Sequence, residues 1–100
     1  MPEPMQVIIN KQARGAILKA LELTHPTPTL STSICEIMTQ IGLIVNPDIS
    51  DHIDYLKGKG YIEVKEVNSK VLSMSVVSLK LTPKGVDLLE ETISDPGVDL

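Results

Sequence analysis

The sequence predicts an α+β domain that is mainly helical, with a three-helix core, a two-stranded β-hairpin and a C-terminal helix. Apolar residues recur at three- and four-residue spacing in the first half of the chain, whereas residues 61–81 alternate between apolar and polar. These two periods are typical of amphipathic helices and of half-buried strands. A chain of 100 residues fits one hydrophobic core. We therefore expect one domain over residues 5–93, between short tails at residues 1–4 and 94–100.

The first helix is expected from about Met5 to Leu23. Its apolar positions share helical spacing, and they are Ile9, Ala13, Ala16, Ile17, Ala20 and Leu21. Residues 25–29 read His-Pro-Thr-Pro-Thr. Because proline lacks the backbone N–H that continues a helix, the first helix should end before this segment.

The second helix is delimited by capping residues. Residues 31–33 offer three candidate N-caps, and Ser33 and Glu36 have the spacing of a capping box. Ile34, Ile37, Met38 and Ile41 would form the apolar stripe of this helix. Gly42 is the expected residue just beyond its end, because glycine adopts the left-handed conformation that terminates many helices.

The third helix has a strong start signal in Asn46-Pro47-Asp48, where a cap, a first-turn proline and an acid follow one another. Ile49, Ile53 and Leu56 fall within a narrow arc at helical periodicity, so these three side chains should anchor the helix inward. The glycines at positions 58 and 60 are expected to end it.

A β-hairpin follows. Residues 61–67 alternate as a strand does, residues 68–70 form the expected turn, and residues 71–81 return. In the return strand Val76 is in phase with the apolar residues before it, whereas Leu79 and Leu81 are in phase with Val77. This change of phase predicts a β-bulge at Val76–Val77.

The last helix should begin with Thr82 as its cap and Pro83 as its first residue. Val86, Leu89 and Ile93 form its predicted stripe, with Leu88 beside it. Residues 94–100 then complete the chain as a tail.

Two segments resemble the winged helix-turn-helix superfamily. The segment SDHIDYLKGKGYIE (residues 50–63) looks like a recognition helix that runs through a glycine turn into the first wing strand. The segment LKLTPKGVDLLE (residues 79–90) looks like the exit from the wing into the last helix. With the intervening wing they cover about two-fifths of the chain. The tail LTPKGVDLLEETISDPGV is also similar to small winged-helix proteins of Mu-like phages and prophages.

This resemblance implies a DNA-binding regulator whose wing contacts the DNA backbone. Candidate contacts are the cationic residues on or near the wing and on the first helix, namely Arg14, Lys57, Lys59, Lys65, Lys70, Lys80 and Lys84. Contacts with the DNA backbone require only positively charged side chains that can reach the phosphates. The alternative for the same residues is an ordinary solvated surface.

The third helix is poorly suited to reading bases. Asp48, Asp51, Asp54 and Tyr55 fall opposite its apolar stripe, with His52 at the flank, where a DNA reader usually presents basic or amide side chains. Phosphates repel carboxylates. The alternative function is therefore a protein-interaction module that keeps the scaffold and binds a basic partner through these five residues.

Composition restricts the function further. The net charge of −4 and the pI of about 5.0 disfavour a phosphate-binding domain, which is normally basic. The chain has no Trp and no Phe, so it lacks the usual platform for stacking on single-stranded bases. No apolar run is long enough for a membrane span.

Catalytic, cofactor and metal sites are not expected. No nucleophile has a recognisable base, so the chain is predicted not to be an enzyme. His25, Cys35 and His52 are too widely spaced for a zinc site. Cys35 is the sole cysteine, which suits a reducing cytoplasmic environment, and we expect it to be a small core residue.

A homodimer is expected if the chain binds DNA as its resemblance implies, because two wings would then reach successive half-sites. Two surfaces could form such a dimer. One is Val7 and Ile8, which lie off the main stripe of the first helix, and the other is Leu88 of the last helix.

Overall fold

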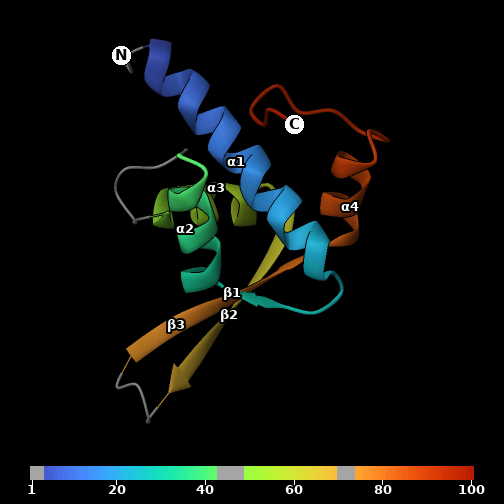
Figure 1. The fold of residues 1–100 in the computed structure, drawn as a ribbon. Coiled ribbons are helices and arrows are strands. Elements are labelled where there is room, and N and C mark those ends of the chain that lie inside the picture. The colour runs from blue at the N-terminus through green and yellow to red at the C-terminus, as the bar shows by residue number, and fades with distance from the viewer. Residues whose placement is uncertain (1–3, 43–48, 70–73) are drawn as a thin grey trace.

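A computed structural model of the chain describes residues 4–42, 49–69 and 74–100. Within these residues, four helices and three strands follow in the order α1 (Pro4–Thr24), β1 (Thr29–Leu30), α2 (Ser31–Gln40), α3 (Ser50–Gly58), β2 (Ile62–Ser69), β3 (Met74–Leu81) and α4 (Pro83–Leu89). The helices gather at one end, and the β2–β3 hairpin extends away from them (Figure 1). The predicted mainly helical α+β class is confirmed.

The three strands form one antiparallel sheet in the order β1-β3-β2. Strands β2 and β3 pair without interruption from Ile62↔Leu81 to Ser69↔Met74, so the predicted bulge is wrong. Val76 lies opposite Val67, whereas Val77 lies opposite Glu66, on the other face of the sheet. The change of phase therefore arises because both faces of β3 carry apolar residues, and no residue is inserted.

Strand β1 was not predicted. It pairs with β3 through Thr29↔Leu79 and Leu30↔Ser78, so the sheet has a third strand beside the expected hairpin. A two-residue strand has no periodicity that could be recognised in a sequence. The segment 25–28, in contrast, forms the expected turn after α1.

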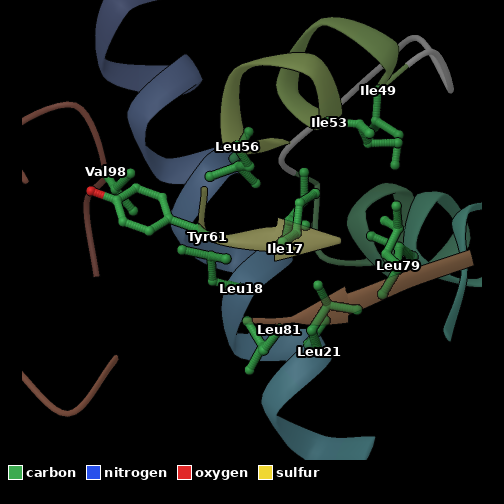
Figure 2. Close-up of a cluster of buried hydrophobic side chains, with 14 of the residues drawn as sticks. Ile17, Leu18, Leu21, Ile49, Ile53, Leu56, Tyr61, Leu79, Leu81 and Val98 are labelled. Carbon is green, nitrogen blue, oxygen red and sulfur yellow. The ribbon is translucent and has the colours of Figure 1, made fainter. Parts of the chain in front are cut away.

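The core lies between the four helices and the inner face of the sheet. Figure 2 shows Ile17, Leu18 and Leu21 of α1 converging with residues of α3 and the strands. The predicted anchors Ile49, Ile53 and Leu56 are all buried, as expected. Among the residues that the structure describes, the buried apolar ones are Ala13, Ile17, Leu18, Ala20, Leu21, Ile34, Met38, Ile49, Ile53, Leu56, Tyr61, Ile62, Leu79, Leu81, Leu88 and Val98.

The starts of α2 and α3 differ from the prediction. The N-cap of α2 is Leu30, without a side-chain cap bond, so the predicted Ser33–Glu36 capping box is wrong. Strand pairing brings the chain directly into α2, and the helix therefore starts two residues before Ser33. Helix α3 begins at Ser50, after Ile49. The predicted cap and first turn, residues 46–48, lie outside the described residues.

The ends of the helices agree in part. Gly42 follows α2 with a φ of 76°, the left-handed conformation expected of a terminating glycine. The last turn of α2 is less buried than predicted, because Ile37 and Ile41 are exposed.

Helix α4 has the predicted start and a shorter length. The hydroxyl of Thr82 accepts a hydrogen bond from the Gly85 amide at 3.1 Å, which confirms the cap. The helix ends at Leu89 instead of Ile93, and Glu91 then takes a positive φ of 63°. Leu88, at 2% exposure, points into the core. Its proposed part in a dimer surface is therefore wrong.

Residues 94–100 pack against α1 and form neither helix nor strand. Val98 is buried, and the Asp99 amide donates to the Lys11 carbonyl oxygen at 3.0 Å. The Asp99 carbonyl group occupies the position that a Cβ on Gly15 would need, so glycine allows this close approach. The C-terminal segment thus covers one side of the first helix.

Helix α1 is the longest in the described ranges, with 21 residues, and neither it nor another helix there has the length and apolar content of a transmembrane span.

Candidate functional site

The cationic residues that are candidates for contacting DNA form two groups. The groups differ in whether the cation makes contacts within the chain. Arg14 belongs to the first group. Its guanidinium carbon lies 3.7 Å from the centroid of the Tyr55 ring, and Nη1 donates to the Gly97 carbonyl oxygen at 3.1 Å. The Nε atom is buried and has no hydrogen-bond partner among the described residues. Arg14 therefore joins α1, α3 and the C-terminal segment, and its charge is directed into the protein.

Lys59 contributes to a second internal contact, the Asp95 cluster, which comprises Lys59, Tyr61, Asp95 and Gly97. The Tyr61 hydroxyl donates to Oδ2 of Asp95 at 2.6 Å, and the Gly97 amide donates to Oδ1 at 2.7 Å. The Lys59 ammonium lies 3.7 Å from Oδ2. The Asp95 side chain is 7% exposed, so a largely buried carboxylate is balanced by two hydrogen-bond donors and one ammonium group.

The Asp95 cluster shifts the pKa values of its two acids in opposite directions. Burial and the hydrogen bond to Asp95 raise the pKa of Tyr61 to about 12. The hydrogen bond from Tyr61 lowers the pKa of Asp95, and the Gly97 amide and Lys59 act in the same direction against the effect of burial. Asp95 is therefore held as a carboxylate and Tyr61 as a neutral phenol.

Lys84 is also engaged at the base of the hairpin. Its ammonium donates to the Lys59 carbonyl oxygen at 3.0 Å and lies 5.4 Å from the Tyr61 ring centroid. Lys84 and Lys59 therefore stabilise the junction of α3, β2 and α4. We call Arg14, Lys59 and Lys84 the basal cations.

The second group consists of Lys57, Lys65 and Lys80, which we call the outer cations. Within the described residues, their ammonium groups make no hydrogen bond or ion pair. Lys57 is exposed in the last turn of α3. Lys65 is exposed on β2 and Lys80 is half-buried on β3. Lys70, the remaining candidate, lies outside the described residues.

Lys65 and Lys80 share the outer face of the hairpin. Their cross-strand partners are Ser78 and Glu63, and all four positions alternate with the buried residues of the inner face. Glu63 beside Lys80 offsets part of the local positive charge. Lys65 lies opposite a neutral serine and is therefore less compensated than Lys80.

The outer surface of α3 is acidic, as expected. Asp51 and Asp54 are exposed there, while Asp48 lies outside the described residues. Tyr55 is half-buried beneath Arg14, with its hydroxyl close to Gly97. Because its ring already packs against a guanidinium, Tyr55 is not presented to a partner as an exposed aromatic anchor.

His52 is half-buried at the flank of α3. Burial lowers its pKa, the positive charge of Arg14 lowers it further, and Asp51 opposes these effects. His52 is therefore largely neutral at pH 7.

The remaining candidates are scattered. Cys35 is partly buried and packs against the core, and His25 is exposed in the turn after α1. In the part of the chain that the structure describes, no group of three or more His, Cys, Asp or Glu side chains could hold a metal ion.

The Asp95 cluster was missed by the sequence analysis, which treated residues 94–100 as a tail. The available signal was the segment Asp95-Pro96-Gly97, because aspartate followed by proline and glycine is typical of an ordered turn. The hydrogen bond between this turn and Tyr61 depends on long-range packing, so the local sequence could not predict it.

Comparison of the chain with protein-family models, curated proteins and solved structures gave no match.

Proposed function

We propose that the chain is a winged-helix protein without catalytic activity that binds duplex DNA, and that the β2–β3 hairpin is its wing. The order α1-β1-α2-α3-β2-β3-α4 supports this assignment, together with the resemblance of residues 50–90 to winged-helix regulators. The same resemblance favours a regulator of phage or prophage origin that acts in the cytoplasm.

The observation that carries the proposal is the placement of Lys65 and Lys80 on one face of the β2–β3 hairpin. This hairpin protrudes from the helices (Figure 1). Neither ammonium group is used for an internal contact within the described residues. Lysine side chains on the protruding hairpin can reach phosphates, whereas the basal cations are engaged in contacts within the chain. The outer cations are therefore the DNA contacts that we propose.

Helix α3 has a minor role in this proposal. Phosphates would repel Asp51 and Asp54 on its outer surface, and these carboxylates offer no hydrogen-bond donor to base edges. The donor near them is the ammonium group of Lys57. We therefore expect binding with little sequence preference, dominated by counterion release.

Fluorescence anisotropy with a random duplex, at about 20 mM and about 150 mM salt, tests this function. We expect binding at the lower concentration and a steep loss at the higher one. Each of Lys65→Ala and Lys80→Ala should reduce the slope of log K against log salt by about 0.9, because each removes one phosphate contact. Lys19→Ala, which removes one exposed charge from α1, is the matched control and should leave the slope unchanged.

A further variant sharpens the test. Asp51→Lys with Asp54→Lys should strengthen DNA binding, since two repulsive groups become attractive. Absence of binding at low salt, or equal slopes for Lys65→Ala and Lys19→Ala, would contradict the proposed function.

A second function is favoured by the same acidic surface. The exposed carboxylates of Asp51 and Asp54 lie one turn apart on α3 and would attract a basic protein partner. In that case a lysine-rich peptide should bind the wild type, and the Asp51→Lys, Asp54→Lys variant should not bind it. Lys65→Ala should then have no effect on peptide binding.

A further inference from the structure

Two of the basal cations converge on the ring of Tyr55 in α3. The guanidinium carbon of Arg14 lies 3.7 Å from the ring centroid, and the Lys59 ammonium lies 5.6 Å from it. Along the chain, Lys59 lies between two of the proposed DNA contacts, Lys57 in α3 and Lys65 in β2. The junction between α3 and the hairpin therefore carries positive charge of its own, next to residues that we propose to contact phosphates.

The C-terminal segment, residues 94–100, engages both cations. It contains two aspartates and no basic residue. The Asp95 carboxylate lies 3.7 Å from the Lys59 ammonium, and the Gly97 carbonyl oxygen accepts a hydrogen bond from Arg14 at 3.1 Å. The Lys59 side chain is 47% exposed, so its ion pair, rather than burial, separates this ammonium from anions in solution. A DNA phosphate is an anion of the kind that lysine and arginine bind, and it would compete with Asp95 for Lys59.

Few contacts attach this segment to the rest of the chain. Of its residues, all of which the structure describes, Val98 is the only apolar one whose side chain is buried. The Asp99 amide donates to the Lys11 carbonyl oxygen at 3.0 Å, in addition to the polar contacts of Asp95 and Gly97. Segments with few buried apolar contacts open locally at a lower free-energy cost than global unfolding. We therefore expect the C-terminal segment to detach while the rest of the fold stays intact.

We propose that the C-terminal segment is an autoinhibitory element for DNA binding. While it is docked, Lys59 and Arg14 are withheld from phosphates. When it is displaced, both cations become available, and a phosphate takes the place of the Asp95 carboxylate beside Lys59. This inference rests on the proposed function, because it concerns the regulation of the same binding surface. The coupling is reciprocal, so DNA favours detachment by the same factor by which detachment favours DNA.

Gly97→Ala tests the inference in the full chain without changing a charge. A Cβ at this position would collide with the Tyr55 hydroxyl, so the substitution displaces the segment. Fluorescence anisotropy with a random duplex should give a slope of log K against log salt that is steeper than that of the wild type by about 0.9 to about 1.8, because one or two more cations reach phosphates. Gly58→Ala is the matched control, since a Cβ there meets nothing within 4 Å, and it should keep the wild-type slope.

A second pair of variants tests the role of the Asp95 carboxylate. Asp95→Asn removes the ion pair with Lys59, and the slope should become steeper by about 0.9. Adding Lys59→Ala to Asp95→Asn should cancel this gain, because the released cation is then absent. Glu22→Gln removes one carboxylate from an exposed position on α1 and should leave the slope unchanged.

Detachment is measured without DNA through the titration of Tyr61, whose pKa is about 12 when the segment is docked. Gly97→Ala should lower this pKa, because the segment carries Asp95 and covers the ring. A lowered pKa together with the wild-type salt slope would overturn the inference and leave the proposed function intact. An unchanged pKa would also overturn it, since the segment then stays docked. Absence of DNA binding by the wild type and all variants at low salt would instead contradict the proposed function, and this inference with it.

Discussion

The basal and outer cations consist of the same residue types but have different surroundings. Arg14, Lys59 and Lys84 each contact a tyrosine ring, a carbonyl oxygen or a carboxylate. The outer cations Lys57, Lys65 and Lys80 have no such contact within the described residues. The first group therefore contributes to stability, and the second is available for intermolecular contact.

This difference shows why a count of basic residues is a poor guide to a binding surface. The chain has nine Lys and Arg residues, yet the arginine is used to join α1, α3 and the C-terminal segment. A guanidinium that is stacked on a ring and bonded to a carbonyl oxygen would have to lose both contacts to reach a phosphate.

The largest effect is expected for Arg14→Ala. Loss of the contact with Tyr55 and of the hydrogen bond to Gly97 should reduce the free energy of unfolding by about 2 kcal/mol. Urea denaturation measures this change. Lys65→Ala, from the outer cations, should change the free energy of unfolding by less than about 0.5 kcal/mol. Equal effects for the two variants would abolish the distinction between the groups.

Asp95→Asn should have the next largest effect. The substitution removes the buried charge that the Asp95 cluster balances, and we expect a loss of about 1 kcal/mol in urea denaturation. Asp54→Asn, at an exposed position on α3, is the control and should be nearly neutral.

The same variant changes the titration of Tyr61. In the wild type its pKa of about 12 exceeds the ordinary value of 10.0, so this contribution to stability is lost as pH rises from about 10 to about 12. Asp95→Asn should lower the pKa of Tyr61, because the carboxylate no longer opposes the phenolate. Ultraviolet absorbance of tyrosinate measures the shift, and an unchanged titration would show that Asp95 does not influence Tyr61.

The smallest effect is expected at His52. Its pKa is lowered in the folded state, so the unfolded chain binds the proton more readily. The free energy of unfolding should therefore fall as pH decreases through 6.5, the ordinary value for histidine. His52→Asn should reduce the difference between urea midpoints at about pH 5 and about pH 7.5. A variant with the same pH dependence as the wild type would exclude His52 as a cause.

Local signals predicted the elements that depend on local chemistry. A few neighbouring residues were enough to predict three features. They are the inward stripe of Ile49, Ile53 and Leu56, the Thr82 cap and the alternation of the hairpin. Each was confirmed by burial, a hydrogen bond or strand register. The predicted bulge failed because alternation reports which faces are apolar and does not report how many residues oppose one another.

Long-range packing decided what the sequence did not reveal. Strand β1 exists because β3 lies beside Thr29, about fifty positions later in the chain. The Asp95 cluster likewise depends on Tyr61, and Leu88 is buried only because of the way α4 docks. No periodicity or spacing encodes such encounters.

The sequence by itself determined the mainly helical class, the inward face of α3 and the acidic character of its outer face, because these follow from residue type and periodicity. Only the tertiary structure decided which cations make contacts within the chain, and that residues 94–100 join the core. The physical reason is that a buried charge must find its partners wherever the fold brings them, and these partners are far apart in the chain.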